Sequence, residues 1–112
     1  MSSFLAPLHG ESVLAWYEKK HKKWGLFGGK AEPADQEDSC RTAIREFQEE
    51  WKEATGIALD KQFVKDLHSL GRQIIIPNKG GTVHTMSATP WMVKAEKVHS
   101  ALRWVSYALC RR

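Results

Sequence analysis

Four glutamates near the middle of the chain are the residues best suited to chemistry. They are Glu46, Glu49, Glu50 and Glu53, and on a helix they fall within an arc of about 100°. Carboxylates this close repel one another unless cations lie between them. Mg2+ prefers oxygen ligands and typically takes one or two carboxylates together with waters and substrate phosphates. The spacing fits a Mg2+ site, but a solvated acidic helix face is the commoner explanation of such a pattern.

The helix that must position these acids is the clearest element in the sequence. The pattern predicts a helix over residues 36–54, capped by Asp35 or Asp38 and ended by Gly56. The four acids should lie opposite its apolar stripe. That stripe recurs at helical spacing and consists of Cys40, Ile44, Phe47, Trp51 and Ala54.

Strand-like segments on both sides of this helix predict an α+β domain. Upstream, residues 12–17 and 24–27 indicate two strands joined by a basic turn at 19–23, and Gly28 and Gly29 should end the second strand. Downstream, 61–70 fits a helical turn or a strand. The remaining expected elements are strands at 72–77, 82–95 (interrupted or bulged at Pro90) and 102–107, with a turn at 78–81.

Length and composition fit one small domain covering residues 1–112. No apolar run is long enough for a transmembrane helix, and the first eight residues lack the features of a signal peptide. Cys40 and Cys110 form no disulfide framework or metal knuckle, so both are expected to be reduced thiols in a cytoplasmic protein.

Charge is divided along the chain. Residues 31–60 carry three basic and nine acidic side chains, whereas residues 61–112 carry nine basic and two acidic ones. An acidic segment in a basic frame fits a metal site for a phosphorylated ligand, because carboxylates hold the cation and the bases attract the anion. A solvated acidic helix face explains the same distribution.

An ordered motif around the acidic helix resembles the signature of the Nudix hydrolase family. That signature runs Gly, five residues, Glu, seven residues, Arg-Glu, an apolar residue, any residue, Glu-Glu, any residue, Gly, apolar. Gly29 matches its opening glycine and Gly56-Ile57 its ending. The central match is Arg45-Glu46-Phe47-Gln48-Glu49-Glu50.

The resemblance implies a fold, an activity and a set of site residues. The fold would be an α/β/α sandwich, with a mixed sheet and one long glutamate-rich helix. Glu46, Glu49 and Glu50 would bind Mg2+ or Mn2+, and Gly29 would add a backbone carbonyl. Glu46 would orient or deprotonate the attacking water while Arg45 orients Glu46, so that a diphosphate bond in a nucleoside-diphosphate-linked substrate is cleaved.

The chain departs from the signature at two places. Two extra residues stand between Gly29 and Arg45, so the first acid is either Asp35 or Glu37. Four extra residues stand between Glu50 and Gly56. Four residues turn a helix through about 400°, so one added turn changes the helical phase by only about 40°.

Residues outside the signature are candidates for substrate contact. Lys30 and the bases of the turn at 19–23, Lys23 among them, could meet phosphates, although solvated turn lysines are the commoner case. Trp91 follows Pro90 at the expected bulge and could face a ligand. Glu96 is the nearby candidate for an additional downstream acid. Which phosphorylated nucleotide-type small molecule is the partner stays open, because the specificity loops carry no signature.

Two further functions remain compatible with the sequence. A non-catalytic Nudix-fold module could bind nucleotide or RNA through its basic surface, and a plain interaction domain could bind a basic partner through its acidic helix. A homodimer without membrane association is expected. Little strand sequence precedes Val13, and the chain stops five residues after Tyr107, which would leave faces such as Trp104 and Leu109 uncovered.

Overall fold

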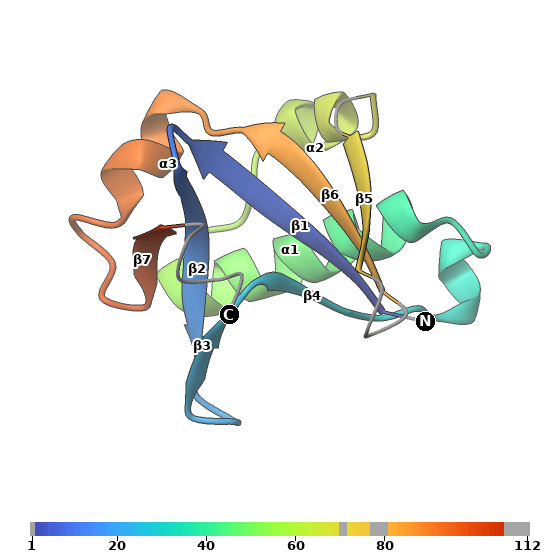
Figure 1. The fold of residues 1–112 in the computed structure, drawn as a ribbon, viewed down its shortest axis with the longest axis horizontal. Helices are drawn as coiled ribbons and strands as arrows, with labels where there is room; N and C mark the ends of the chain where they lie inside the picture. Colours follow the sequence, from blue (N-terminus) through green and yellow to red (C-terminus); the bar gives the residue numbers. More distant parts are fainter. Residues whose placement is uncertain (1, 70–71, 77–80, 107–112) are drawn as a thin grey trace.

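The computed structural model describes residues 2–69, 72–76 and 81–106. Its described elements begin with four strands, followed by helices, two more strands, a helix and a last strand (Figure 1). In chain order they are β1 Ser2–His9, β2 Ser12–Glu18, β3 Lys23–Gly25, β4 Phe27–Lys30, the short 3-10 helix Pro33–Asp35, α1 Ser39–Thr55, α2 Lys61–Leu67, β5 Arg72–Ile76, β6 Gly81–Ser87, α3 Pro90–Ala95 and β7 Leu102–Ser106.

The strands form one mixed seven-stranded sheet in the order β3-β2-β1-β6-β5, with β4 paired to β1 and β7 paired to β2. Strand β1 runs parallel to β6 and antiparallel to β2 and β4. The predicted fold class, α+β with one long glutamate-rich helix, is confirmed.

Helix α1 begins and ends where its capping residues predict. Asp38 is the N-cap, and its side chain accepts hydrogen bonds from the amides of Cys40 and Arg41. Gly56 is the C-cap, with a φ of 76° that glycine adopts without strain. The helix therefore starts at Ser39, three residues later than expected.

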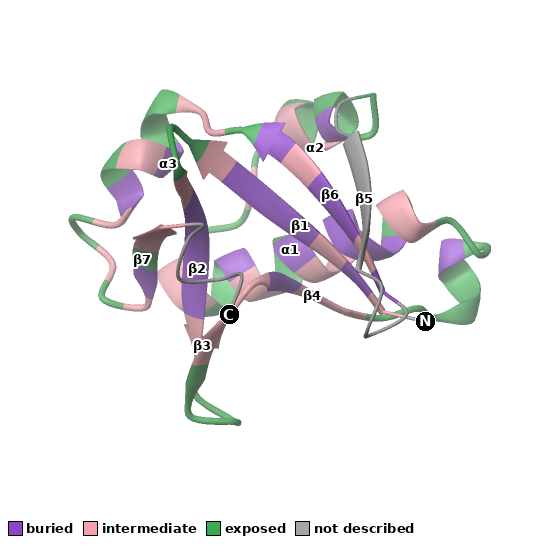
Figure 2. Ribbon diagram, viewed as in Figure 1, coloured by how far each residue is buried: buried purple, intermediate pink, exposed green. Residues whose placement is uncertain are grey.

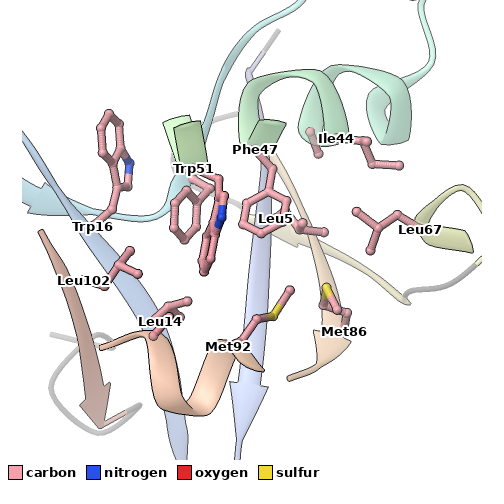
Figure 3. Packing of buried hydrophobic residues seen from close by; sticks show 13 residues of the cluster. Leu5, Leu14, Trp16, Ile44, Phe47, Trp51, Leu67, Met86, Met92 and Leu102 are labelled. Carbon is pink, nitrogen blue, oxygen red and sulfur yellow. The ribbon is translucent and has the colours of Figure 1, made fainter. Parts of the chain in front are cut away.

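The apolar stripe of α1 packs against the sheet and the other helices (Figure 3). Phe47 is fully buried and meets Phe27 of β4 edge to face, with 4.8 Å between ring centroids. Ile44 and Trp51 are also buried in this cluster, which includes Leu67 of α2 and Met92 of α3. All three helices therefore contribute to the main cluster.

A smaller cluster lies on the other face of the sheet. It contains the buried residues Ala6, Val13 and Val83, all from strands, with further strand residues half-buried around them. Strands β1 and β2 are buried over most of their length because side chains from both of their faces are covered (Figure 2).

Strand β1 was not expected, and the idea that little strand sequence precedes Val13 is wrong. Pro7 argues against a strand at this position, because proline has no N–H to donate to a neighbouring strand. Here it falls between the residues paired with β4, which end at Leu5, and those paired with β2, which begin at Leu8. The missing N–H can therefore face a side where β1 has no partner strand.

The expected strand over 82–95 is also wrong in its second half. Strand β6 ends at Ser87, and Pro90–Ala95 forms helix α3. Thr89 caps this helix by accepting a hydrogen bond from the Met92 amide at 3.3 Å, and Pro90 occupies the first turn, where its missing N–H costs nothing. Met92 and Ala95 form the buried side of this short helix.

Gly28 and Gly29 extend a strand where they were expected to end one. Both belong to β4, opposite Phe4 and Ser3 of β1. A Cβ added to Gly28 would lie 2.4 Å from the Ser3 carbonyl oxygen, so only glycine allows β4 to approach β1 this closely. The break in the expected strand falls at Leu26, between β3 and β4.

The remaining expected helices and strands are present in the described residues. Residues 61–67 form the helix α2, while β5 and β7 occupy the expected strand positions. The ends of those two expected strands, Pro77 and Tyr107, the predicted turn up to Gly80 and the expected dimer residue Leu109 lie outside the described residues. Within the described part of the chain, no helix is both long and apolar enough to cross a membrane.

Candidate functional site

Arg45 lies at the centre of a charged network between α1 and the segment that precedes it. Its Nε and Nη2 donate to the two oxygens of Asp35, each at 3.1 Å, and Nη2 also donates to the Lys30 carbonyl at 3.1 Å. Nη1 contacts Oε1 of Glu46 at 3.0 Å and Oε1 of Glu49 at 3.4 Å. The bidentate contact with Asp35 fixes the plane of the guanidinium.

Asp35 is the acid that holds Arg45. It is 3% exposed and also accepts hydrogen bonds from the Glu32 amide at 2.8 Å and the Thr42 hydroxyl at 2.9 Å. The Arg45 hydrogen bonds and the Glu32 amide hold the pKa of Asp35 well below its usual range. Glu37 is exposed and lies in a turn with a φ of 60°. The spacing from Gly29 therefore locates the partner of Arg45.

Glu46 and Glu50 lie against the two glycines of β4. The Gly28 amide donates to Oε1 of Glu50 at 2.7 Å. A Cβ on Gly29 would lie 2.6 Å from the carboxyl carbon of Glu46, so that carboxylate occupies the space that glycine leaves open. Both glutamates are half-buried, although they belong to the acidic arc expected to lie opposite the apolar stripe.

Burial changes the acidity of these two carboxyl groups. It raises the pKa of Glu50 to about 8, an effect opposed by the Gly28 amide and supported by repulsion from Glu46, Glu18 and Glu53. It also raises the pKa of Glu46, opposed by the hydrogen bond from Arg45 and supported by Glu49. Arg45 therefore offsets the effect of burial at Glu46, and the Gly28 amide offsets it at Glu50.

Glu49 and Glu53 occupy the outer side of the same arc. The Glu49 side chain is 60% exposed and has Arg45 as a partner, and Glu53 is exposed. The expectation that all four acids lie opposite the apolar stripe is therefore wrong for Glu46 and Glu50, which lie on its flank.

The donor set suits a divalent cation in kind, although the acids are not gathered around one point. Glu46 and Glu50 offer hard oxygen ligands beside the backbone of Gly29. Within the described residues, no group of three or more His, Cys, Asp or Glu side chains is arranged to hold a metal ion. Arg45 instead contacts Glu46 and Glu49.

The two lysines expected to bind phosphate lie on different strands, β4 and β3. Lys30 ends β4, where its carbonyl accepts from Arg45 and its side chain is exposed. Lys23 starts β3 and is paired in register with Glu18. A polar cavity of about 540 Å³ adjoins Arg45 on the other flank of α1, with Asp35, Arg41, Gln48 and His68 in its wall.

Trp91 lies in a separate cavity of about 550 Å³, whose lining contains none of the signature acids. The Trp91 ring meets Trp51 and Phe63 edge to face, with centroid distances of 5.3 and 5.0 Å. The interpretation of Trp91 as a residue at a bulge is wrong, because it is in α3. Glu96 is the half-buried C-cap residue of α3.

Some functional contacts were missed by sequence reasoning. The Gly28 amide as a donor to Glu50 and the Thr42 hydroxyl as a donor to Asp35 depend on strand and turn geometry. Glu18 acts on Glu50 through space from 32 positions earlier in the chain. None of these contacts follows from helical spacing, which relates residues only within one element.

The fold and site together define an α+β domain in which the acid-rich helix α1 lies against the glycines of β4. Arg45 of the helix donates a hydrogen bond to the Lys30 carbonyl at the end of that strand. No protein-family model matches the chain, and no curated protein is similar to it in sequence. Among solved structures, NrtR of Shewanella oneidensis is similar, with a TM-score of 0.51 and 20% identity, over 96% of this chain and 51% of that one. This chain thus spans about half of the NrtR structure.

Two further structures resemble the chain more weakly. A hydrolase of the NUDIX family from Clostridium perfringens has a TM-score of 0.43 and 22% identity, over 94% of this chain and 79% of that one. NrtR in complex with a 27mer DNA has a TM-score of 0.43 and 17% identity, over 96% and 51% of the two chains. The likeness to NrtR, at 20% identity and a TM-score of 0.51, concerns the fold alone.

Proposed function

We propose that the chain is a metal-dependent hydrolase that cleaves a diphosphate bond in a nucleoside-diphosphate-linked substrate. The observation that carries the proposal is the placement of Glu46 and Glu50 against Gly28 and Gly29, with Arg45 held by Asp35. These are the residues through which the sequence resembles the Nudix signature. Paired carboxylates with raised pKa values, beside a fixed arginine, mark a candidate site for acid–base chemistry.

The residues of the site would divide the work. Arg45 orients the Glu46 carboxylate, which accepts a proton from the attacking water. The Gly28 amide holds Glu50 in place, and Glu49 on the outer side completes the proposed ligand set. Mg2+ or Mn2+, held by Glu46, Glu49 and Glu50 with the Gly29 carbonyl, would supply charge to polarise the phosphate and lower the pKa of water. Lys30 and Lys23 are proposed to meet substrate phosphates.

A screen with and without metal tests this function. The protein is incubated with nucleoside triphosphates, dinucleotide polyphosphates, nucleotide sugars, ADP-ribose and capped RNA, and products are separated by anion-exchange chromatography. Turnover is expected with millimolar Mg2+ or Mn2+, and it should rise toward alkaline pH. Full turnover in excess chelator would exclude the mechanism.

A second candidate is a module with this fold that binds nucleotide or RNA without cleaving it. Two observations favour it. No group of three acids is arranged to hold a metal ion among the described residues, and Arg45 forms ion pairs with two of the proposed metal ligands, Glu46 and Glu49. Calorimetry would separate the two functions, because tight nucleotide binding with no product after long incubation in Mn2+ supports the module. The cytoplasmic homodimer stays a prediction, and light scattering at micromolar concentration tests its oligomeric state.

A further inference from the structure

The turn between β2 and β3 concentrates positive charge at the end of a protruding hairpin. Lys19, Lys20, His21 and Lys22 are consecutive and all exposed. The hairpin extends beyond both the rest of the sheet and α1, and its tip is solvent-exposed throughout (Figures 1 and 2). Glu18, the last residue of β2, adjoins the tip, and its Oε1 lies 2.7 Å from Nδ1 of His21. The three lysines of the tip have no ion pair among the described residues.

Below this tip, two rings and a guanidinium are packed on one face of the hairpin. The Arg103 guanidinium carbon lies 4.3 Å from the centroid of the Trp24 ring. Tyr17 meets the same indole edge to face, with 5.4 Å between centroids. Arg103 is exposed, whereas both rings are half-buried. A guanidinium that lies over an indole and is exposed on its outer side can stack a further planar group.

Strand register places this stack on the face directed away from α1. Tyr17 is opposite Trp24, and Arg103 is opposite Ala15, so all three share one face of β2. Trp16 points to the other face and is buried in the cluster that contains α1. The register therefore places the stack on the sheet face opposite Glu46 and Glu50. We call the stack and the tip lysines the hairpin surface: Tyr17, Lys19, Lys20, Lys22, Trp24 and Arg103.

We propose that the hairpin surface binds single-stranded nucleic acid, with phosphates at the lysines of the tip and a base stacked on the Arg103 guanidinium over Trp24. Lysines track a phosphate backbone without reading sequence. A base stacks on an aromatic or guanidinium plane only where it is unpaired, which favours a single strand over a duplex.

The stack distinguishes a nucleic acid from other polyanions. An anionic membrane surface would use the lysines of the tip and would be indifferent to whether residue 103 is planar. An acidic peptide would likewise pair with charge alone. Only a ligand that carries both phosphates and planar bases uses the lysines and Arg103 together.

Fluorescence anisotropy in excess chelator tests the proposal independently of hydrolysis. The probes are labelled 20-nucleotide poly(U) and (dT), a duplex of the same length, and inorganic polyphosphate, each titrated over a series of salt concentrations. We expect affinity for the single strands in the micromolar range at moderate salt, and weaker binding of the duplex. Tighter binding of the duplex, or of vesicles containing 30% phosphatidylserine, would overturn the proposal.

Two variants with matched controls locate the binding. Changing Lys19, Lys20 and Lys22 to Gln should weaken poly(U) binding about tenfold and lower the slope of log affinity against log salt by about 2. The control changes three other exposed lysines, Lys61, Lys65 and Lys97, to Gln and alters net charge equally. An equal loss in the control would show that binding follows net charge and would refute the assignment.

Arg103→Lys keeps the charge but removes the planar group. It should weaken poly(U) binding about fivefold, the scale of one stacked base, and leave polyphosphate binding unchanged. An unchanged poly(U) affinity, or an equal loss for both probes, would remove the stack from the proposal. Thermal melting of each variant checks that the hairpin stays folded.

Discussion

The four glutamates of α1 form two pairs with the same spacing and different surroundings. Glu46 and Glu50 lie against β4, where one carboxylate occupies space left by Gly29 and the other accepts the Gly28 amide. Glu49 and Glu53 lie one step around the helix and face solvent. Burial raises the pKa values of the first pair. The partner strand, rather than helical spacing, thus determines which carboxylates have altered chemistry.

The largest expected difference between the pairs is in turnover. If the proposed hydrolase function holds, Glu46→Gln, Glu49→Gln or Glu50→Gln should each lower kcat/KM at least about a hundredfold, the scale of losing an acid–base or charge-stabilising group. Glu53→Gln should change it only a few-fold. Glu49 tests the boundary, because it belongs to the proposed ligand set and yet is largely exposed.

The same four variants test the register of the motif. If the signature were anchored on Gly56-Ile57, Glu50 and Glu53 would enter the site and Glu46 would leave it. A large loss of kcat/KM in Glu53→Gln together with a small loss in Glu46→Gln would favour that register. The contacts of Arg45 with Asp35 and Glu46 support the register anchored on Arg45.

The two glycines of β4 should respond differently to the same added methyl group. In Gly28→Ala the Cβ meets backbone atoms of Ser3 and Phe4, which cannot move away cheaply, so we expect a loss of about 3 kcal/mol in the free energy of unfolding. In Gly29→Ala it meets the carboxylate of Glu46, at the end of a flexible side chain. Stability should then change by less than about 1 kcal/mol.

Urea unfolding and kinetics together check this pair. Gly29→Ala should lower turnover about tenfold or more, since it displaces Glu46 from the site. Gly25→Ala is the control, because nothing lies within 4 Å of its added Cβ. Equal instability of the Gly28 and Gly29 variants would contradict the assignment of Gly29 to the site and Gly28 to the sheet.

The sequence predicted those parts of the fold that repeat at a regular spacing. Helix α1, its Asp38 cap and its Gly56 end follow from a stripe recurring over four turns and from capping chemistry. Strand β1 was missed because Pro7 argues against a central strand, and its tolerance depends on where β2 and β4 stop pairing. Helix α3 was missed because a six-residue helix is too short to show a period.

The sequence pointed to some residues of the candidate site and not to their contacts. Spacing from Gly29 pointed to Asp35 as one of two possible first acids, and Asp35 contacts Arg45. The burial of Glu46 and Glu50 was unforeseen, because it depends on a strand formed by two glycines that read as a strand end. A glycine pair opposite an acidic helix is the signal that could have suggested a close approach.

The Asp35–Arg45 contact should stabilise the protein in a pH-dependent way. The pKa of Asp35 is depressed in the folded state, so its contribution is full above its ordinary pKa and is lost as the pH falls toward the folded value. Asp35→Asn should therefore lower Tm clearly at pH 7, and the gap from the unmodified protein should narrow between pH 5 and pH 3. Glu37→Gln, an exposed neighbour, should leave Tm unchanged. A gap independent of pH would mean that packing, and not charge, is the contribution of Asp35.

The smallest expected effect has the opposite sign. Burial raises the pKa of Glu50 to about 8, so ionising it costs stability as the pH rises from its ordinary value of 4.5 toward 8. Removing the charge should therefore stabilise the metal-free protein while it lowers activity.

In excess chelator, Glu50→Gln should raise Tm by several degrees at pH 8.5 and hardly at all at pH 4.5, since about 1 kcal/mol moves Tm by roughly 4–8 °C in a small domain. The glutamine oxygen can still accept the Gly28 amide, so the fold is kept. Glu53→Gln is the matched control. It lies nearer the C-terminus of α1, where removing an acid relieves the helix dipole at least as much, yet it is exposed. Equal stabilisation by both variants would mean that the helix dipole, and not burial against β4, distinguishes the acids of α1 from ordinary surface glutamates.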